Sequence, residues 1–119
     1  MTLRLRKTKG AGLSQPPLQA LLDSASEFVA SQAHEYGENT YCNDMPFQYD
    51  VGEGMEITIW FLLHPFTWFQ LTTVIHGLHL YILDGKRYKA YGFEIGGLES
   101  PDGYPWLGWG DIGTSRQAS

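Results

Sequence analysis

Residues 66–85, FTWFQLTTVIHGLHLYILDG, decide the fold because they carry a helix from its start signal to its stop signal. Thr67 lies three residues before Gln70, which is the spacing of a capping box. Phe66 and Leu71 occupy the two positions of a hydrophobic staple. Apolar residues recur at the spacing of one helical face: Leu71, Val74, Ile75, Leu78 and Ile82. We therefore predict an amphipathic helix that ends at the closing Asp-Gly pair.

The same apolar spacing occurs once more, nearer the N-terminus. Pro16 and Pro17 can open a helix, because the first helical turn tolerates a fixed φ and a missing N–H. The apolar face that follows consists of Leu18, Leu21, Leu22, Ala25 and Val29. Gly37 is expected to end this second amphipathic helix.

Alternating polarity predicts strands between and after the two helices. Residues 47–51 and 55–61 alternate apolar and polar side chains around a Gly-Glu-Gly turn, which is typical of a β-hairpin. Residues 91–95 and 106–112 are expected to form two more strands. The predicted class is α+β in the order α-β-β-α-β-β, with both helices packed on one face of a four-stranded, mainly antiparallel sheet.

The chain of 119 residues has room for one core, and residues 14–113 are predicted to form it. Residues 1–13 are interpreted as a flexible basic arm, and residues 114–119 as a C-terminal tail. An alternative stays open for the arm, because Leu3 and Leu5 alternate with Arg4 and Arg6 and could add an edge strand.

The charge distribution argues against a nucleic-acid partner. Thirteen acidic residues face eight basic ones, which gives a net charge of −5. Four of the basic residues lie in the first ten positions: Arg4, Arg6, Lys7 and Lys9. The remaining chain is strongly acidic and would repel phosphate backbones, so no nucleic acid is expected to bind.

Cysteine usage and hydropathy bear on the compartment. Cys42 is the only cysteine, so an internal disulfide is impossible, which is typical of a reducing environment. The basic N-terminus is not followed by the apolar core of a signal peptide. The longest apolar run, residues 57–63, is too short to span a bilayer. A cytoplasmic protein without a membrane partner is expected, or a secreted one if a leader has been removed.

Aromatic side chains provide the candidate binding residues. We expect the ligand to contact Trp60, Trp68, Trp106, Trp109 and Tyr49. These rings could line a pocket or form the centre of an interface, because Trp and Tyr are enriched at both kinds of site. The alternative is that they fill a small core, in which each ring buries a large area.

Three residues near these rings could perform acid–base chemistry: His64, Glu56 and Asp111. A histidine and a carboxylate beside an apolar pocket can exchange protons with a substrate. The alternative is that all three are ordinary loop and surface residues. His76 and His79 have a spacing that could bind a metal, but no third ligand is evident, so no metal is expected. The chain carries no dinucleotide, P-loop or EF-hand motif, and no cofactor is expected.

Two classes of function fit these residues. The first is a domain that binds an apolar small molecule in an aromatic pocket and could act as a cofactor-free isomerase or cyclase. The second is a non-catalytic protein-interaction module, effector-like or part of an assembly, that could also form a homodimer. A concave aromatic pocket favours the first class. A flat aromatic surface rimmed by acidic groups, which would select a basic partner, favours the second.

Three stretches resemble a pattern in small uncharacterised fungal proteins: FTWFQLTTVIHGLHLYIL at 66–83, YGFEIGG at 91–97 and WLGWGDI at 106–112. The shared features are a Thr-Trp helix start, a Gly-Leu pair in mid-helix and a closing Gly-x-Gly segment. The resemblance covers the second half of the chain. It implies a small α+β domain and no particular activity.

Overall fold

A computed structural model describes residues 2–7, 15–44, 46–51, 54–62, 65–89, 91–96 and 106–114, with the backbone alone at positions 2, 4, 6, 7, 106 and 114. The elements are β1 Thr2–Lys7, α1 Gln15–Tyr36, β2 Phe47–Asp50, β3 Met55–Phe61, α2 Trp68–His79, the π-helical turn η1 Leu80–Asp84, β4 Tyr91–Gly96 and β5 Trp106–Thr114. Their order confirms the predicted α-β-β-α-β-β sequence, with one further strand before it.

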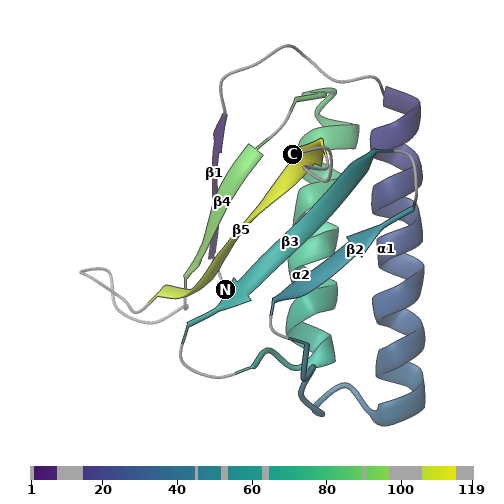
Figure 1. The fold of residues 1–119 in the computed structure, drawn as a ribbon, viewed down its shortest axis with the longest axis vertical. Coiled ribbons are helices and arrows are strands. Elements are labelled where there is room, and N and C mark those ends of the chain that lie inside the picture. Colours follow the sequence, from purple (N-terminus) through teal and green to yellow (C-terminus); the bar gives the residue numbers. More distant parts are fainter. Residues whose placement is uncertain are drawn as a thin grey trace.

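The strands form one sheet in the order β1-β4-β5-β3-β2, and every neighbouring pair is antiparallel. Both helices lie on the same face of this sheet, behind the strands in the view of Figure 1. The predicted α+β class, with two helices on one face of an antiparallel sheet, is therefore confirmed.

The fifth strand comes from the N-terminal segment. Leu3 and Leu5 pair with Ile95 and Phe93 of β4 and are half-buried. Residues 2–7 thus belong to the sheet, which was the alternative to a flexible arm, while residues 8–14 lie outside the described part of the chain. Gly77 of α2 makes room for this strand, because a β carbon there would lie 3.1 Å from Leu3 Cδ2.

Helix α1 follows its predicted pattern from start to stop. All five residues of its predicted apolar face are buried: Leu18, Leu21, Leu22, Ala25 and Val29. The helix ends where Gly37 adopts a left-handed φ of 100°, and the Gly37 N–H donates a hydrogen bond to the Ala33 carbonyl at 2.9 Å. A left-handed residue at this position is the usual helix stop, and glycine adopts it without strain.

Helix α2 begins with the predicted capping box. The Gln70 N–H donates to Thr67 Oγ1 at 3.1 Å, and the Thr67 N–H donates to Gln70 Oε1 at 2.9 Å. The next two N–H groups of the helix, from Trp68 and Phe69, donate to the carbonyls of residues 40 and 38. The loop after α1 therefore satisfies the donors that a helix start leaves unpaired. Within the described residues, neither helix is long and apolar enough to cross a membrane.

Candidate functional site

The sheet has one face covered by helices and one open face. Along β3, Ile57, Ile59 and Phe61 point into the helical core and are buried. Because side chains alternate along a strand, the residues between them point to the open face. On this face β3 carries Glu56, Thr58 and Trp60, and the central strand β5 carries Trp109 and Asp111. Thr58 is only 2% exposed, so this part of the face is covered.

Trp60 and Trp109 are the dominant pair of the open face. They stand opposite each other in the β3–β5 register. Their ring centroids lie 5.9 Å apart and their planes are inclined by 15°, so the indoles stack. Trp109 is 43% exposed and Trp60 is half-buried. A large exposed apolar pair of this kind is informative, because indoles are otherwise well covered in folded domains.

Glycines on both sides of Trp109 let the backbone of β3 and the core rings approach β5 closely. A β carbon at Gly108 would lie 2.3 Å from the Trp60 carbonyl oxygen, and one at Gly110 would lie 2.3 Å from the Thr58 carbonyl oxygen. The Phe93 ring, 2.7 Å from the same point at Gly110, fills the space on the core side. No larger residue fits at these two positions unless the backbone of β3 moves.

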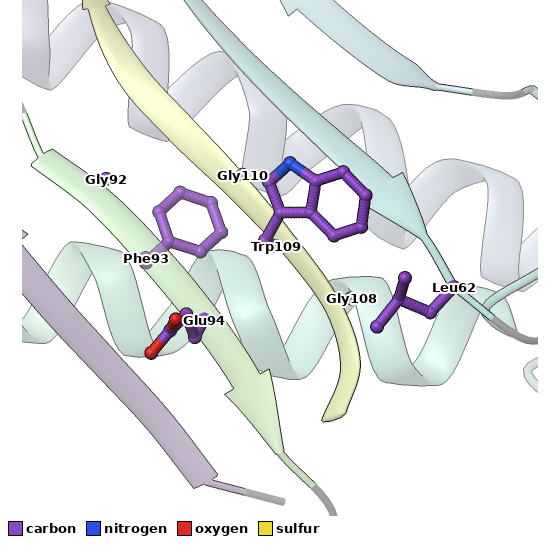
Figure 2. A pocket seen from close by; sticks show the side chains of 7 residues that line it. All are labelled: Leu62, Gly92, Phe93, Glu94, Gly108, Trp109 and Gly110. Atoms are coloured by element: carbon purple, nitrogen blue, oxygen red, sulfur yellow. The ribbon is translucent and has the colours of Figure 1, made fainter. Parts of the chain in front are cut away.

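A hollow of about 290 Å³ lies beside Trp109 on the open face. Its lining consists of Leu62, Gly92, Phe93, Glu94, Gly108, Trp109 and Gly110. Figure 2 shows that Trp109 leans from β5 toward β3, that Leu62 lies beyond the end of β3, and that Glu94 stands on β4. The volume is at the lower limit of ligand pockets, so the hollow suits one ring or one side chain.

Two of the predicted ligand-contacting residues lie on the other side of the sheet. Tyr49 pairs with Ile57 and points toward α1, where its hydroxyl lies 2.6 Å from Ser24 Oγ. Trp68 is only 7% exposed and meets the Phe28 ring edge-on at a centroid distance of 6.2 Å.

The position of Trp68 has a simple physical reason. Trp68 precedes Leu71 by three residues, so it extends the apolar face of α2 instead of lying off it. Contrary to expectation, therefore, Tyr49 and Trp68 do not share a pocket with Trp60 and Trp109. They belong to the core, which was the alternative reading of the aromatic residues.

The other predicted site residues divide between the open face and undescribed positions. Glu56 and Asp111 lie on the open face, toward the end of the strands away from the indole pair. Glu56 Oε2 accepts a hydrogen bond from Thr58 Oγ1 at 3.2 Å, and Asp111 is exposed. Trp106 pairs with Gly96 through its backbone, and its side chain lies outside the described part, as does the whole of His64.

Sequence reasoning missed Glu94, Leu62 and Gly92, which line the hollow. Glu94 lies between two buried residues of β4, so strand alternation alone would have placed it on the open face. Its position opposite Trp109 depends on the β4–β5 register. No local pattern encodes that register.

The two histidines of α2 make different contacts. His79 Nε2 lies 3.1 Å from Asp23 Oδ1 of α1, and His79 Nδ1 lies 4.0 Å from Asp84 Oδ1. His76 is exposed. Among the described side chains, no group of three or more histidine, cysteine or acidic residues is arranged to hold a metal ion.

Cys42 is completely buried beside the start of α2, and its N–H donates to the Phe66 carbonyl at 2.7 Å. Burial raises the pKa of the Cys42 thiol above its ordinary value. The thiol is therefore protonated at neutral pH, which makes it a poor nucleophile.

Comparison with known proteins finds no match to a family model, to a curated protein or to a solved structure. The resemblance to fungal proteins stays a prediction.

Proposed function

We propose that this domain is a protein-interaction module that binds its partner on the open face of the sheet. The observation that carries the proposal is the stacked pair formed by the half-buried Trp60 and the exposed Trp109. Tryptophan is strongly enriched among the few residues that dominate binding energy at protein interfaces. Exposing two indoles side by side costs solubility, and a partner that covers them offsets this cost.

The shape and charge of the open face also support an interface. The hollow beside Trp109 opens to solvent on a sheet surface, whereas acid–base catalysis on an apolar substrate benefits from a site that excludes water. Three acidic residues share this face with the indole pair: Glu94 stands opposite Trp109, and Glu56 and Asp111 lie farther along the strands. An open aromatic surface that carries acidic groups is the geometry expected of a module that selects a basic partner.

The experiment that tests this proposal is a selection from a displayed library of random peptides on the purified domain. We expect enriched peptides to lose about tenfold or more in affinity when Trp109 is replaced, as in Trp109→Thr. Phe69→Ser is the matched control, because Phe69 is 54% exposed but lies on α2, on the helical side. The proposal would be refuted if the peptides bound Trp109→Thr as tightly as Phe69→Ser. It would also be refuted if the selection enriched no peptide.

Self-association is the variant in which the partner is a second copy of the chain. Light scattering distinguishes it, because replacing Trp60 by a charged residue, Trp60→Lys, would then lower the mass in solution from dimer to monomer. If the wild type and Trp60→Lys both have the mass of one chain, self-association is ruled out and the partner is a different protein.

The second candidate is the binding of an apolar small molecule, and the specific observation in its favour is the hollow of about 290 Å³. In this case Trp109 would stack on the ligand. The expected isomerase or cyclase role of Glu56 and Asp111 gains no support, because neither residue lines the hollow. A screen of small aromatic compounds by thermal unfolding tests this candidate. The candidate is supported if a compound raises the unfolding temperature of the wild-type protein but not that of Trp109→Thr. It is refuted if no compound has this selective effect.

A further inference from the structure

We infer that the hollow beside Trp109 accepts the guanidinium group of an arginine on the partner protein. This inference rests on the proposed function, because it specifies what the open face recognises. It depends on three features of the hollow: an aromatic wall, a carboxylate on the other side and a floor without side chains.

Trp109 and Glu94 line the same hollow. Trp109 and Glu94 stand opposite each other in the β4–β5 register. Figure 2 shows that Trp109 leans toward β3 and that the Glu94 carboxylate leans toward β1, so the space above β5 between them is left open. A group that enters there meets the indole on one side and β4 on the other, and the Glu94 side chain can turn toward it about its own rotatable bonds.

The floor of the hollow is backbone. Gly92 precedes Glu94 by two residues, so it shares the open face with it. A β carbon at Gly92 would meet its nearest atom, the Gly110 carbonyl oxygen, only at 4.0 Å, which leaves the floor flat. Gly108 and Gly110 complete this floor with their peptide groups.

A planar cation fits these surroundings better than other groups. A guanidinium stacks on aromatic faces, and its fork of N–H donors pairs with a carboxylate. A neutral ring in the same place would cover Glu94 without replacing its contacts with water, which is unfavourable. An anion would be repelled by Glu94 and by Asp111 on the neighbouring strand.

Glu94 also stands opposite Arg4 in the β1–β4 register. A carboxylate has two oxygens and about four lone-pair sites, so Glu94 can accept from a guanidinium and keep its other contacts. β4 lies between β1 and β5 in the sheet. The incoming guanidinium would approach Glu94 from the β5 side, where Trp109 lies.

The test uses N-acetylargininamide as the probe and N-acetylcitrullinamide as its neutral, planar counterpart. Binding is followed by the indole N–H resonances in two-dimensional NMR spectra, with Trp109 assigned from the Trp109→Phe variant. We expect the arginine probe to shift the Trp109 resonance and to bind at least about threefold more tightly than the citrulline probe.

Two carboxylate variants separate a local contact from general attraction. Glu94→Gln should abolish the preference for the arginine probe, whereas Glu56→Gln should keep it, because Glu56 lies on the same face but outside the hollow. Equal binding of both probes, equal effects of the two variants, or a shift confined to other tryptophans would overturn the inference.

The result also separates the inference from the proposed function. Selected peptides that need Trp109 but bind equally well after their arginines are replaced would contradict the inference and leave the interaction module intact. A selection that fails altogether would refute the proposed function, and with it the inference.

Discussion

Trp60 and Trp109 stand directly opposite each other on neighbouring antiparallel strands, and their stacked indoles lie on the face of the sheet that the helices leave open. Trp68, by contrast, is buried against Phe28 between the helices and the sheet. The two environments assign different roles to the same residue type: the stacked pair is available for binding, and Trp68 contributes to stability.

The first prediction compares these tryptophans by their contribution to stability. Trp109→Thr should lower the free energy of unfolding by about 1 kcal/mol, because it removes a partly exposed aromatic pair from a strand that tolerates threonine. Trp68→Ala should cost about 3–5 kcal/mol, since it leaves a cavity in the core. Chemical denaturation of both variants measures the difference, and equal losses would contradict the assignment of Trp109 to a binding surface.

The second prediction concerns the glycines of the hollow. Gly110→Ala should destabilise the fold by about 1–3 kcal/mol, because its β carbon would collide with the Thr58 carbonyl oxygen and the Phe93 ring. Gly92→Ala is the matched control on the neighbouring strand, where the β carbon meets open space. It should change the free energy of unfolding by less than about 1 kcal/mol. Thermal or chemical unfolding that ranks the two variants in the reverse order would argue against this packing.

The third prediction concerns the start of α2. Thr67→Ala removes the hydroxyl that accepts the Gln70 N–H, so it should cost about 1 kcal/mol of stability. Thr73→Ala serves as the control, because Thr73 is an exposed residue of the same helix whose hydroxyl only donates to the Phe69 carbonyl. That variant should be neutral or slightly stabilising, since alanine is the better helix former. A Thr67→Ala protein as stable as the wild type would show that the capping box contributes nothing.

The fourth prediction is a loss of stability at alkaline pH. Burial raises the pKa of the Cys42 thiol and the pKa of the Tyr91 hydroxyl in the folded state. A group whose folded pKa lies above its unfolded value contributes stability that is complete below the unfolded pKa and is lost as the pH rises toward the folded pKa. The free energy of unfolding should therefore decrease above pH 9.0, the ordinary pKa of cysteine.

Denaturation curves across this pH range test the prediction with Cys42→Ala as the comparison. The variant should lose the part of the decrease that begins at pH 9.0 and keep the part that begins at the ordinary pKa of tyrosine, 10.0. An unchanged pH dependence in Cys42→Ala would show that the thiol is not the responsible group.

Sequence patterns predicted the elements of this fold well, because each depends on neighbouring residues. The apolar spacing of α1 and α2, the capping box at Thr67 and the stop at Gly37 are all local signals, and the structure contains each of them. The alternation of the 47–61 hairpin likewise depends on residues within one short segment.

The candidate site was less predictable because it depends on contacts between distant strands. The pairing of Trp60 with Trp109, and of Trp109 with Glu94, follows from the order β4-β5-β3, which no local pattern contains. Strand alternation could identify Trp60 as an open-face residue, but it could not identify its neighbours. Helical periodicity, applied one turn further back from Leu71, would have placed Trp68 in the core.

The most direct test of the proposed interface is the binding footprint of a selected peptide, mapped by backbone amide shifts in NMR spectra of the labelled domain. We predict that the largest changes fall on open-face residues of β3, β4 and β5, among them Trp60, Glu94 and Trp109. Changes concentrated instead around Phe69 on α2, with the amides of these three residues unmoved, would contradict it.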